Sequence, residues 1–242
     1  MSSGLSVTVL GADGSYPGPG GACSGYLVRT RTTSLWLDAG PGTLANLQRH
    51  VPLEELDAVV VTHEHIDHWS DLEHLAVAVR WVVPRPPVPL HCEADLVSSM
   101  RAGGPDVFDW LPAGPGEATT VGDMALTFSR TDHPVDTLAV RIDAAGRSLG
   151  YSADSGPAWD LSALGPGIDL ALCEATFLSD REGSLSHMSA RQAGATARAA
   201  GVGRLVVTHL WPRTDRAAAR AEAEKAFAGP VAVAFAGARY EV

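Results

Sequence analysis

Four side chains that commonly bind metals fall within six residues of the sequence. They are His63, His65, Asp67 and His68, and they directly follow the apolar run 57–62. Residues 63 and 65 can face one point while 67 and 68, a turn further on, face another, so the pattern favours two metal ions over one. Imidazole combined with carboxylate oxygen is typical of zinc, iron or manganese sites rather than calcium sites. The competing interpretation is an exposed polar turn, which the buried run directly before it disfavours.

Three further metal-competent residues stand where other predicted strands end. His133 follows the predicted strand 124–131, Asp154 follows 147–152, and His209 follows 204–208. The letters Val-Val-Thr-His occur twice, ending once in His63 and once in His209. Loops at one edge of a rigid sheet are where functional sites are usually assembled. A single histidine in such a place would be read as structural, but four strand ends of this kind indicate a common site.

The elements that must position these residues are short strands interleaved with helices. Apolar patterning predicts strands over 6–10, 26–29, 34–37, 57–62, 88–91, 124–131, 137–142, 147–152, 168–173, 204–208 and 231–235. It predicts helices over 71–82, 94–101, 190–200 and 215–227, with a surface loop over the Gly- and Pro-rich stretch 103–116. Ser189 and Gln192 fit a capping box at the start of helix 190–200, and Gly201 fits its end. With no linker in sight, we expect one domain over 1–242, built as a layered α/β arrangement with helices outside two sheets.

Composition excludes several classes of protein. The chain has 242 residues, of which 45% are hydrophobic and 19% charged, which is an ordinary globular mixture and excludes a disordered chain, a fibre or a disulfide scaffold. Its net charge of −10 argues against broad neutralisation of nucleic-acid phosphates. Three widely spaced cysteines indicate buried thiols in a reducing compartment. Residues 1–11 lack the features of a signal peptide, and the apolar run 75–83 is too short to span a bilayer, so we expect a cytoplasmic protein without membrane association.

The motif at 63–68, followed in order by His133, Asp154 and His209, resembles the metallo-β-lactamase superfamily. This resemblance covers nearly the whole chain and implies an αββα sandwich with a dinuclear metal site. It implies two divalent ions, with zinc as the expected metal and manganese or iron as alternatives. By this resemblance one metal is held by His63, His65 and His133, the other by Asp67, His68 and His209, and Asp154 bridges the two.

Within the superfamily, the sequence is most similar to ribonuclease Z-like proteins and to the atypical class II cyclic-nucleotide phosphodiesterases of actinobacteria. The similarity rests on the stretch 11–27, on 174–177 (Glu-Ala-Thr-Phe), on 187–194 (His-Met-Ser-Ala-Arg-Gln-Ala-Gly) and on 208–212 (Thr-His-Leu-Trp-Pro). It implies that His187 works beside the metals as a general acid, charged and oriented by Glu174. Asp67 would also orient or deprotonate the attacking water. The alternative for His187 is a capping role at the start of helix 190–200.

One departure from the family pattern bears on the substrate. Ribonuclease Z proper carries a long tRNA-gripping arm between its third histidine and the bridging aspartate, whereas here His133 and Asp154 are 154 − 133 = 21 positions apart. Without an arm or a basic cluster, we expect no extended nucleic-acid surface and predict a metal-dependent phosphodiesterase acting on small, cyclic nucleotides. The alternatives are a ribonuclease Z-like tRNA 3′-processing endonuclease and a lactonase- or thioesterase-type hydrolase.

Two further points stay open at this stage. The sequence does not decide whether Phe108, Trp110 and Trp211 stack on a substrate base or pack in the core or a lid. The oligomeric state is also open, with a homodimer as one option because the relatives are often dimers.

Overall fold

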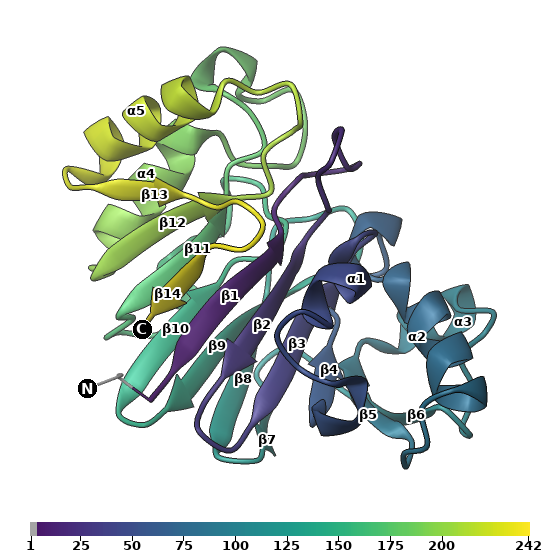
Figure 1. The fold of residues 1–242 in the computed structure, drawn as a ribbon. Coiled ribbons are helices and arrows are strands. Elements are labelled where there is room, and N and C mark those ends of the chain that lie inside the picture. Colours follow the sequence, from purple (N-terminus) through teal and green to yellow (C-terminus); the bar gives the residue numbers. More distant parts are fainter. Residues whose placement is uncertain (1–3) are drawn as a thin grey trace.

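Two β-sheets of seven strands each pack face to face at the centre of the computed structural model, which describes residues 4–242 (Figure 1). Their facing sides form one apolar core that contains Val7, Tyr26 and Leu37 from one sheet and Leu126 and Val140 from the other. The first three residues, which belong to the predicted domain and to the segment searched for a signal peptide, lie outside the described residues.

The first sheet runs in the order β14-β1-β2-β3-β4-β5-β6. Pairing is antiparallel from β14 to β3 and parallel from β3 to β6. Its strands are β1 (Ser6–Gly11), β2 (Gly25–Arg29), β3 (Ser34–Ala39), β4 (Ala58–Val60), β5 (Val88–Cys92), β6 (Phe108–Pro112) and β14 (Arg239–Glu241).

The second sheet runs in the order β13-β12-β11-β10-β9-β8-β7. Here β7 to β10 pair antiparallel and β10 to β13 pair parallel. Its strands are β7 (Ala118–Val121), β8 (Met124–Arg130), β9 (Leu138–Ala144), β10 (Arg147–Tyr151), β11 (Leu170–Glu174), β12 (Arg204–Thr208) and β13 (Val231–Val233). The strictly parallel strand β11 is buried along its whole length, as expected for a strand covered on both faces.

Helices cover the outer face of each sheet (Figure 1). An apolar cluster joins the first sheet to α1 (Thr43–Leu47), α2 (Asp71–Trp81) and α3 (Ala94–Ser99). A separate cluster joins the second sheet to α4 (Ala190–Ala199) and α5 (Arg216–Phe227). Four 3-10 helices complete the described part of the chain: η1 (Leu53–Glu55), η2 (Ile66–His68), η3 (Leu161–Leu164) and η4 (Ser179–Arg181). The order helix, sheet, sheet, helix confirms the predicted αββα sandwich.

Helix α4 begins with the predicted capping box. The Ser189 side chain accepts a hydrogen bond from the Gln192 backbone N–H, and the Gln192 side chain accepts one from the Ser189 N–H. Gly201 follows the helix with a positive φ of 66°, a conformation that glycine adopts without steric cost. The cap of this helix is therefore Ser189, which leaves the His187 side chain free for another role.

The prediction of a surface loop over 103–116 is wrong for its central part. Residues Phe108–Pro112 form strand β6, which pairs parallel with β5 at the edge of the sheet. The flanking glycines and prolines dominate the local pattern, whereas the strand is stabilised by its partner and by burial of Phe108. The short elements α1, β7 and β14 were also not predicted, because each has too few residues to set a period.

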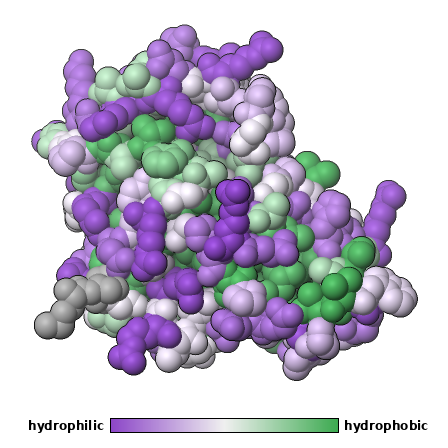
Figure 2. Space-filling view, viewed as in Figure 1, coloured by the Kyte–Doolittle hydropathy of each residue, from purple (hydrophilic) through white to green (hydrophobic). Residues whose placement is uncertain are grey.

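The cysteines, the helices and the surface agree with most of what the sequence predicts. All three cysteines are free and buried, as predicted. No helix within residues 4–242 is long and apolar enough to cross a membrane. The face in Figure 2 is largely hydrophilic, with apolar residues visible both over the region that holds α2 and α3 in Figure 1 and over the region that holds β12 and β13. Exposed Val77 and Trp81 belong to α2, and exposed Val97 belongs to α3.

Strand β8 offers a direct test of the packing between the sheets, because its residues alternate between buried and exposed. Leu126 is fully buried in the core between the sheets, and its neighbour Thr127 is exposed. We expect Leu126→Ala to lower the free energy of unfolding by about 2–5 kcal/mol, since it leaves a cavity in a packed core. Thr127→Ala should change it by less than about 0.5 kcal/mol. Urea unfolding of both variants measures this, and equal losses would contradict the assigned faces of β8.

Candidate metal centre

Strands of both sheets end at one edge of the sandwich, and the predicted site residues meet there. The motif 63–68 follows β4, Asp154 follows β10, and His209 follows β12. His133 comes from the turn between β8 and β9. The carboxyl ends of parallel strands lie at the same edge of a sheet, which is why residues far apart in sequence converge. The structure brings all seven predicted ligands into two adjoining groups: His63, His65, Asp67, His68, His133, Asp154 and His209.

The first group consists of three histidines and one oxygen of Asp154. Nδ1 of His65 lies 3.1 Å from Nε2 of His63 and 3.0 Å from Nε2 of His133. Oδ2 of Asp154 lies 3.6 Å from Nε2 of His63 and 4.0 Å from Nε2 of His133. Four potential ligand atoms therefore surround one point, as a metal of low coordination number requires.

The second group holds Asp67, His68, His209 and the other oxygen of Asp154. Oδ2 of Asp67 lies 3.6 Å from Nε2 of His68 and 3.3 Å from Nε2 of His209. Oδ1 of Asp154 lies 3.2 Å from Nε2 of His68 and 3.4 Å from Nε2 of His209. The two oxygens of Asp154 thus face different groups, which is the position of a bridging ligand.

The outward nitrogens of four histidines are already committed to the protein. His63 donates from Nδ1 to the Thr62 hydroxyl (3.1 Å), His68 to Asp38 (2.8 Å), His133 to the Ser186 carbonyl (3.2 Å) and His209 to the Thr176 hydroxyl (3.0 Å). Such a bond fixes the tautomer and directs the lone pair of Nε2 inward. The arrangement is that of metal-ligating histidines.

Two buried atoms at the centre lack the partners that buried polar atoms need. Nε2 of His68 and Oδ1 of Asp154 make no hydrogen bond within the described residues, although 3.2 Å separates them. Asp38, Asp67 and Asp154 form their ion pairs with histidines alone in the described part of the chain. A buried polar atom without a partner and an excess of buried carboxylates both cost free energy that a bound cation removes. The residues therefore fit a metal.

The protonation states suit the same function. Burial lowers the pKa of His63 and of His133, so both imidazoles are neutral near pH 7 and able to bind a metal. Burial opposes ionisation of Asp154, but the neighbouring His209 and His68 outweigh it and hold its pKa well below the usual range. Burial would likewise lower the pKa of His68, yet Asp154 and Asp38 raise it instead. A cation at Nε2 of His68 would thus take the place of a proton.

Asp38 supports the centre from behind, and sequence reasoning missed it. This fully buried carboxylate accepts hydrogen bonds from His68 Nδ1, from the Tyr151 hydroxyl (2.8 Å) and from the Thr62 backbone N–H (2.9 Å). The signal was present, because Asp38 ends the predicted strand 34–37 just as the other site residues end theirs. Tyr151 lies in β10, where a tyrosine is indistinguishable from an ordinary packing residue. Thr176 belongs to the segment 174–177 that carries the family resemblance, but that resemblance assigned it no role.

The backbone is strained at three points of the centre. Asp38, Ala153 and His209 have positive φ values of 56°, 51° and 55°. Residues other than glycine rarely adopt this conformation, which costs about 1–3 kcal/mol and tends to occur at functional sites. At Gly40 the requirement is space, because a Cβ there would lie 2.0 Å from the Asp67 carbonyl oxygen. The centre is therefore built at the expense of local backbone stability.

His187 and Glu174 stand next to the second group. Nδ1 of His187 donates to Oε1 of Glu174 over 2.9 Å, and the His187 ring stacks on His209 with 5.5 Å between centroids. Glu174 is fully buried and also accepts bonds from the Ser155 N–H and the Thr176 hydroxyl, each 2.7 Å long. Burial alone would lower the pKa of His187, but Glu174 raises it to about 9. The structure thus places a protonated, partly exposed imidazole beside the candidate metal centre.

The three aromatic residues fall in different places. Phe108 is fully buried under α2 and α3, and Trp110 packs against it with 5.7 Å between centroids, so both belong to the outer core. Trp211 follows His209 by two residues and donates from Nε1 to the Ser15 hydroxyl (3.0 Å). The Ser15 backbone N–H in turn donates to Oδ2 of Asp67 (2.8 Å). Of the three, only Trp211 is connected to the centre.

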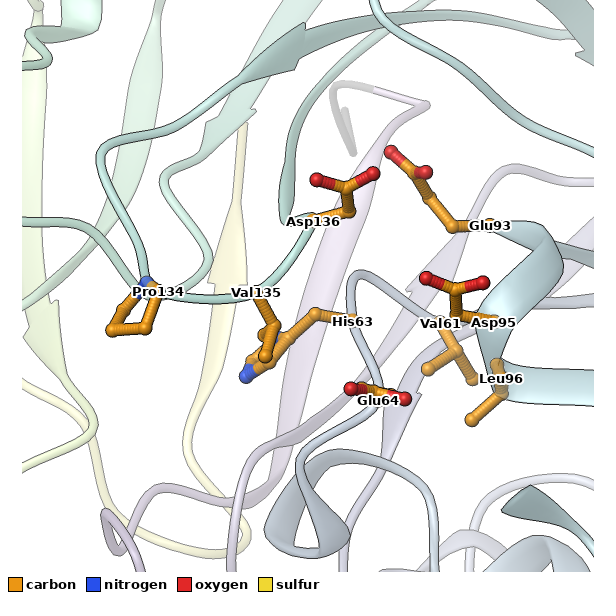
Figure 3. Close-up of a pocket in the computed structure, with 9 residues that line it drawn as sticks. All are labelled: Val61, His63, Glu64, Glu93, Asp95, Leu96, Pro134, Val135 and Asp136. Carbon is orange, nitrogen blue, oxygen red and sulfur yellow. The ribbon is translucent and has the colours of Figure 1, made fainter. Parts of the chain in front are cut away.

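A cavity of about 270 Å³ adjoins the centre on the His63 side (Figure 3). Four carboxylates face it, from Glu64, Glu93, Asp95 and Asp136. Arg130 pairs with Glu93 and Asp136, whereas no ion pair is found for Glu64 or Asp95 in the described part of the chain. The cavity is therefore unfavourable for an anionic group, although it is open to a neutral or cationic one.

The contacts of Asp38 predict how it affects the second group. Asp38→Asn should weaken metal binding by about 10–100-fold, because the amide holds the His68 imidazole less firmly in its metal-binding tautomer. Tyr151→Phe removes only one of the other bonds to Asp38 and should cost less. Titration of the metal-loaded proteins with a chelator measures both effects. Identical chelator midpoints for Asp38→Asn and the unaltered protein would show that Asp38 does not support a metal.

Comparison of the fold with solved structures finds close similarity to a bacterial protein. A metallo-β-lactamase-fold protein of Bacillus subtilis, YhfI, superposes with a TM-score of 0.91 at 33% sequence identity, covering 98% of this chain and 99% of that one. More distant matches share the fold alone. They include the short form of human tRNase Z (TM-score 0.77, 18% identity, 97% of this chain and 98% of that one) and a diphosphatase of the PhnP family (TM-score 0.78, 16% identity, 98% of each).

Sequence comparison agrees with this result. The protein Rv1339 of Mycobacterium tuberculosis is 36% identical over 98% of this chain and 92% of its own length. A ribonuclease Z of Mycobacterium bovis is 30% identical over 86% of each chain. Residues 33–210, which include every candidate ligand, match the family described as the beta-lactamase superfamily domain. The chain belongs to the metallo-β-lactamase superfamily.

Proposed function

We propose that this metallo-hydrolase is a dinuclear phosphodiesterase that opens small, cyclic nucleotide phosphodiesters. The observation that carries the proposal is the pair formed by His187 and Glu174. A bare metal centre suffices to hydrolyse lactones and thioesters, whereas the strongly basic leaving oxygen of a phosphodiester benefits from an acid that protonates it.

The metals would be held as the two groups suggest, with zinc as the expected ion. His63, His65 and His133 would hold one, Asp67, His68 and His209 would hold the other, and Asp154 would contribute an oxygen to each. When bound, two divalent cations neutralise a phosphodiester and make a water molecule acidic enough to serve as the nucleophile. Asp67 would help to orient that water or take its proton.

His187 would then act at the opposite end of the bond that breaks. Its Nδ1 is occupied by Glu174, which leaves Nε2–H as the proton donor to the departing oxygen. Glu174 is itself held by two further bonds and cannot turn away. The raised pKa of His187, about 9, keeps the donor protonated near pH 7.

The small substrate is inferred from what lies between His133 and Asp154. Strands β9 and β10 occupy most of this stretch and form part of the sheet, so no arm leaves the fold there. The net charge of −10 also disfavours a long polyanion. Among proteins that share the fold are the PhnP-family diphosphatase and a yeast protein named PDE1 (TM-score 0.73, 13% identity), so the fold accommodates phosphoester chemistry.

The alternative of a ribonuclease Z-like tRNA 3′-processing endonuclease is supported by the 30% identity to the M. bovis enzyme. A lactonase or thioesterase has no observation in its favour beyond the metal groups.

The cytoplasmic location and the homodimer stay predictions.

The first prediction from the proposed function concerns metal content. The metal-loaded protein should contain two equivalents of metal per chain, measured by elemental analysis. His63→Ala should lose metal and hydrolysis of bis(p-nitrophenyl) phosphate together, because a missing ligand empties a site. His74→Ala is the matched control, since the His74 side chain is 76% exposed and lies outside both groups. One equivalent or fewer in the unaltered protein would contradict a dinuclear centre.

A second prediction separates general-acid catalysis from a structural role of His187. His187→Ala should keep the metals and the fold while kcat falls by about 10²–10⁴-fold on a substrate with a poor leaving group. The loss should be much smaller for p-nitrophenolate, which leaves without a proton. Equal losses for good and poor leaving groups would instead mean that His187 binds the phosphate, and no loss would favour lactone or thioester chemistry.

The pH profile tests the pairing with Glu174. A protonated acid with a pKa of about 9 predicts that activity falls as the pH rises through this value. Glu174→Gln removes the carboxylate that raises the pKa, so this alkaline limb should move to lower pH. We expect a smaller loss of kcat than in His187→Ala. An unmoved limb would show that Glu174 does not tune His187.

Substrate size gives a fourth prediction. Pre-tRNA should be cleaved with a lower kcat/KM than a small cyclic phosphodiester under the same conditions, because nothing in the fold grips the tRNA body. Steady-state kinetics with 3′,5′-cyclic AMP and an unprocessed tRNA measure the ratio. A kcat/KM for pre-tRNA that is tenfold larger would favour the tRNA-processing alternative.

A further inference from the structure

The guanidinium of Arg181 is left without an ion pair by the described part of the fold. It also makes no side-chain hydrogen bond within the described residues, and its central carbon lies over the Trp211 ring, 4.9 Å from the ring centroid. By contrast, Arg141, Arg191 and Arg216 are each held by a carboxylate. A guanidinium that lies over an aromatic ring and is not bound to a carboxylate keeps its N–H groups available to a ligand.

The segment that carries Arg181 is firmly attached on both sides. Ser179 donates to Glu222 of α5 from its backbone N–H (2.9 Å) and from its hydroxyl (2.7 Å). On the other side, Glu182 accepts bonds from Ser189 (2.6 Å) and from Arg191 (2.7 Å and 2.8 Å). Arg181 is thus presented from a fixed backbone, and binding through it costs less ordering entropy than binding through a mobile arginine.

Trp211, whose ring lies beneath the guanidinium, is linked by hydrogen bonds to the candidate metal centre. Trp211 is two residues from His209, and its Nε1 donates to Ser15, whose backbone N–H donates to Asp67. The same loop that carries Arg181, between β11 and α4, also carries His187. Arg181 is therefore linked through Trp211 and Ser15 to Asp67, and it does not line the acidic cavity beside His63.

We propose that Arg181, stacked on Trp211, binds a second phosphate of the substrate, next to the phosphodiester that is cleaved. This inference rests on the proposed phosphodiesterase function and narrows its substrate class to nucleotides with an additional phosphate. The scissile phosphodiester is neutralised by the metals, whereas a second phosphate needs its own cation. Arginine supplies it with two parallel N–H bonds. The chain has a net charge of −10, yet this guanidinium has no carboxylate partner in the described part of the chain. The second phosphate of the substrate would be its partner.

Two substrates that differ by one phosphate test the proposal. Thymidine 5′-(p-nitrophenyl phosphate) is compared with the same ester bearing a 3′-phosphate, on the metal-loaded protein. We expect kcat/KM to be about tenfold higher with the 3′-phosphate, mainly through a lower KM, as one charge-assisted pair would give. Arg181→Gln should abolish this preference, while Arg181→Lys retains part of it.

Arg49→Gln is the matched control, because it removes the same charge from an exposed position for which no ion pair is found in the described part of the chain. It should leave the preference unchanged. The inference is overturned if the preference is absent in the unaltered protein, if it persists in Arg181→Gln, or if Arg181→Gln slows both esters equally.

Equilibrium binding keeps this test independent of the proposed reaction. Calorimetry on the metal-loaded protein compares thymidine 3′,5′-bisphosphate with thymidine 5′-monophosphate. Tighter binding of the bisphosphate that Arg181→Gln removes supports the inference even if neither ester is hydrolysed, a result that would refute only the phosphodiesterase. Hydrolysis of both esters with equal affinity for the two nucleotides would refute only the inference.

Discussion

The buried carboxylate of Asp154 is the constraint on which the rest of the site depends. Each of its oxygens faces a different group of imidazoles, and Oδ1 has no hydrogen-bond partner in the described part of the chain. A buried anion of this kind is very unfavourable unless cations compensate it. The neighbouring histidines compensate it partly, and they can do so fully only with protons or metals. Binding of a metal here would therefore be coupled to the stability of this edge of the sandwich.

Each of the two sheets supplies part of the residues that surround Asp154. The first sheet supplies the motif 63–68 and the carboxylate of Asp38 that holds His68, and the second supplies Asp154, Glu174 and His209. Tyr151 of β10 donates across the interface to Asp38 of β3, so the sheets are joined by a hydrogen bond directly behind the centre. Strain in the backbone at Asp38 and His209 is sustained because the packed core fixes both strands. The 3-10 helix η2 carries Asp67 and His68, whereas the α-helices supply no candidate ligand and cover the outer faces.

Sequence patterns were sufficient to predict most of the architecture and the candidate ligands that the structure brings together. Several histidines and aspartates directly follow apolar runs, a pattern that is rare by chance. The helix at 190–200 is indicated by the capping box of Ser189 and Gln192. The supporting residues could not be found in this way. Thr176 and Tyr151 act through single hydroxyl groups whose partners, His209 and Asp38, are distant in sequence.

Strand β6 escaped detection for a related reason, since an edge strand rests on its neighbour more than on its own residues. Likewise, an exposed arginine in a short 3-10 helix, such as Arg181, has no sequence signature. Its significance appears only when its partners can be counted. Local signals thus identify residues that are chemically distinctive, and the structure identifies those that are distinctive by what surrounds them.

Anomalous X-ray diffraction from crystals of the zinc-loaded protein, recorded on both sides of the zinc absorption edge, would show directly whether the centre binds two metals. We expect two peaks per chain. One should lie among His63, His65 and His133, the other among Asp67, His68 and His209, and the carboxylate of Asp154 should touch both. A single peak, or peaks outside these groups, would contradict a dinuclear centre bridged by Asp154.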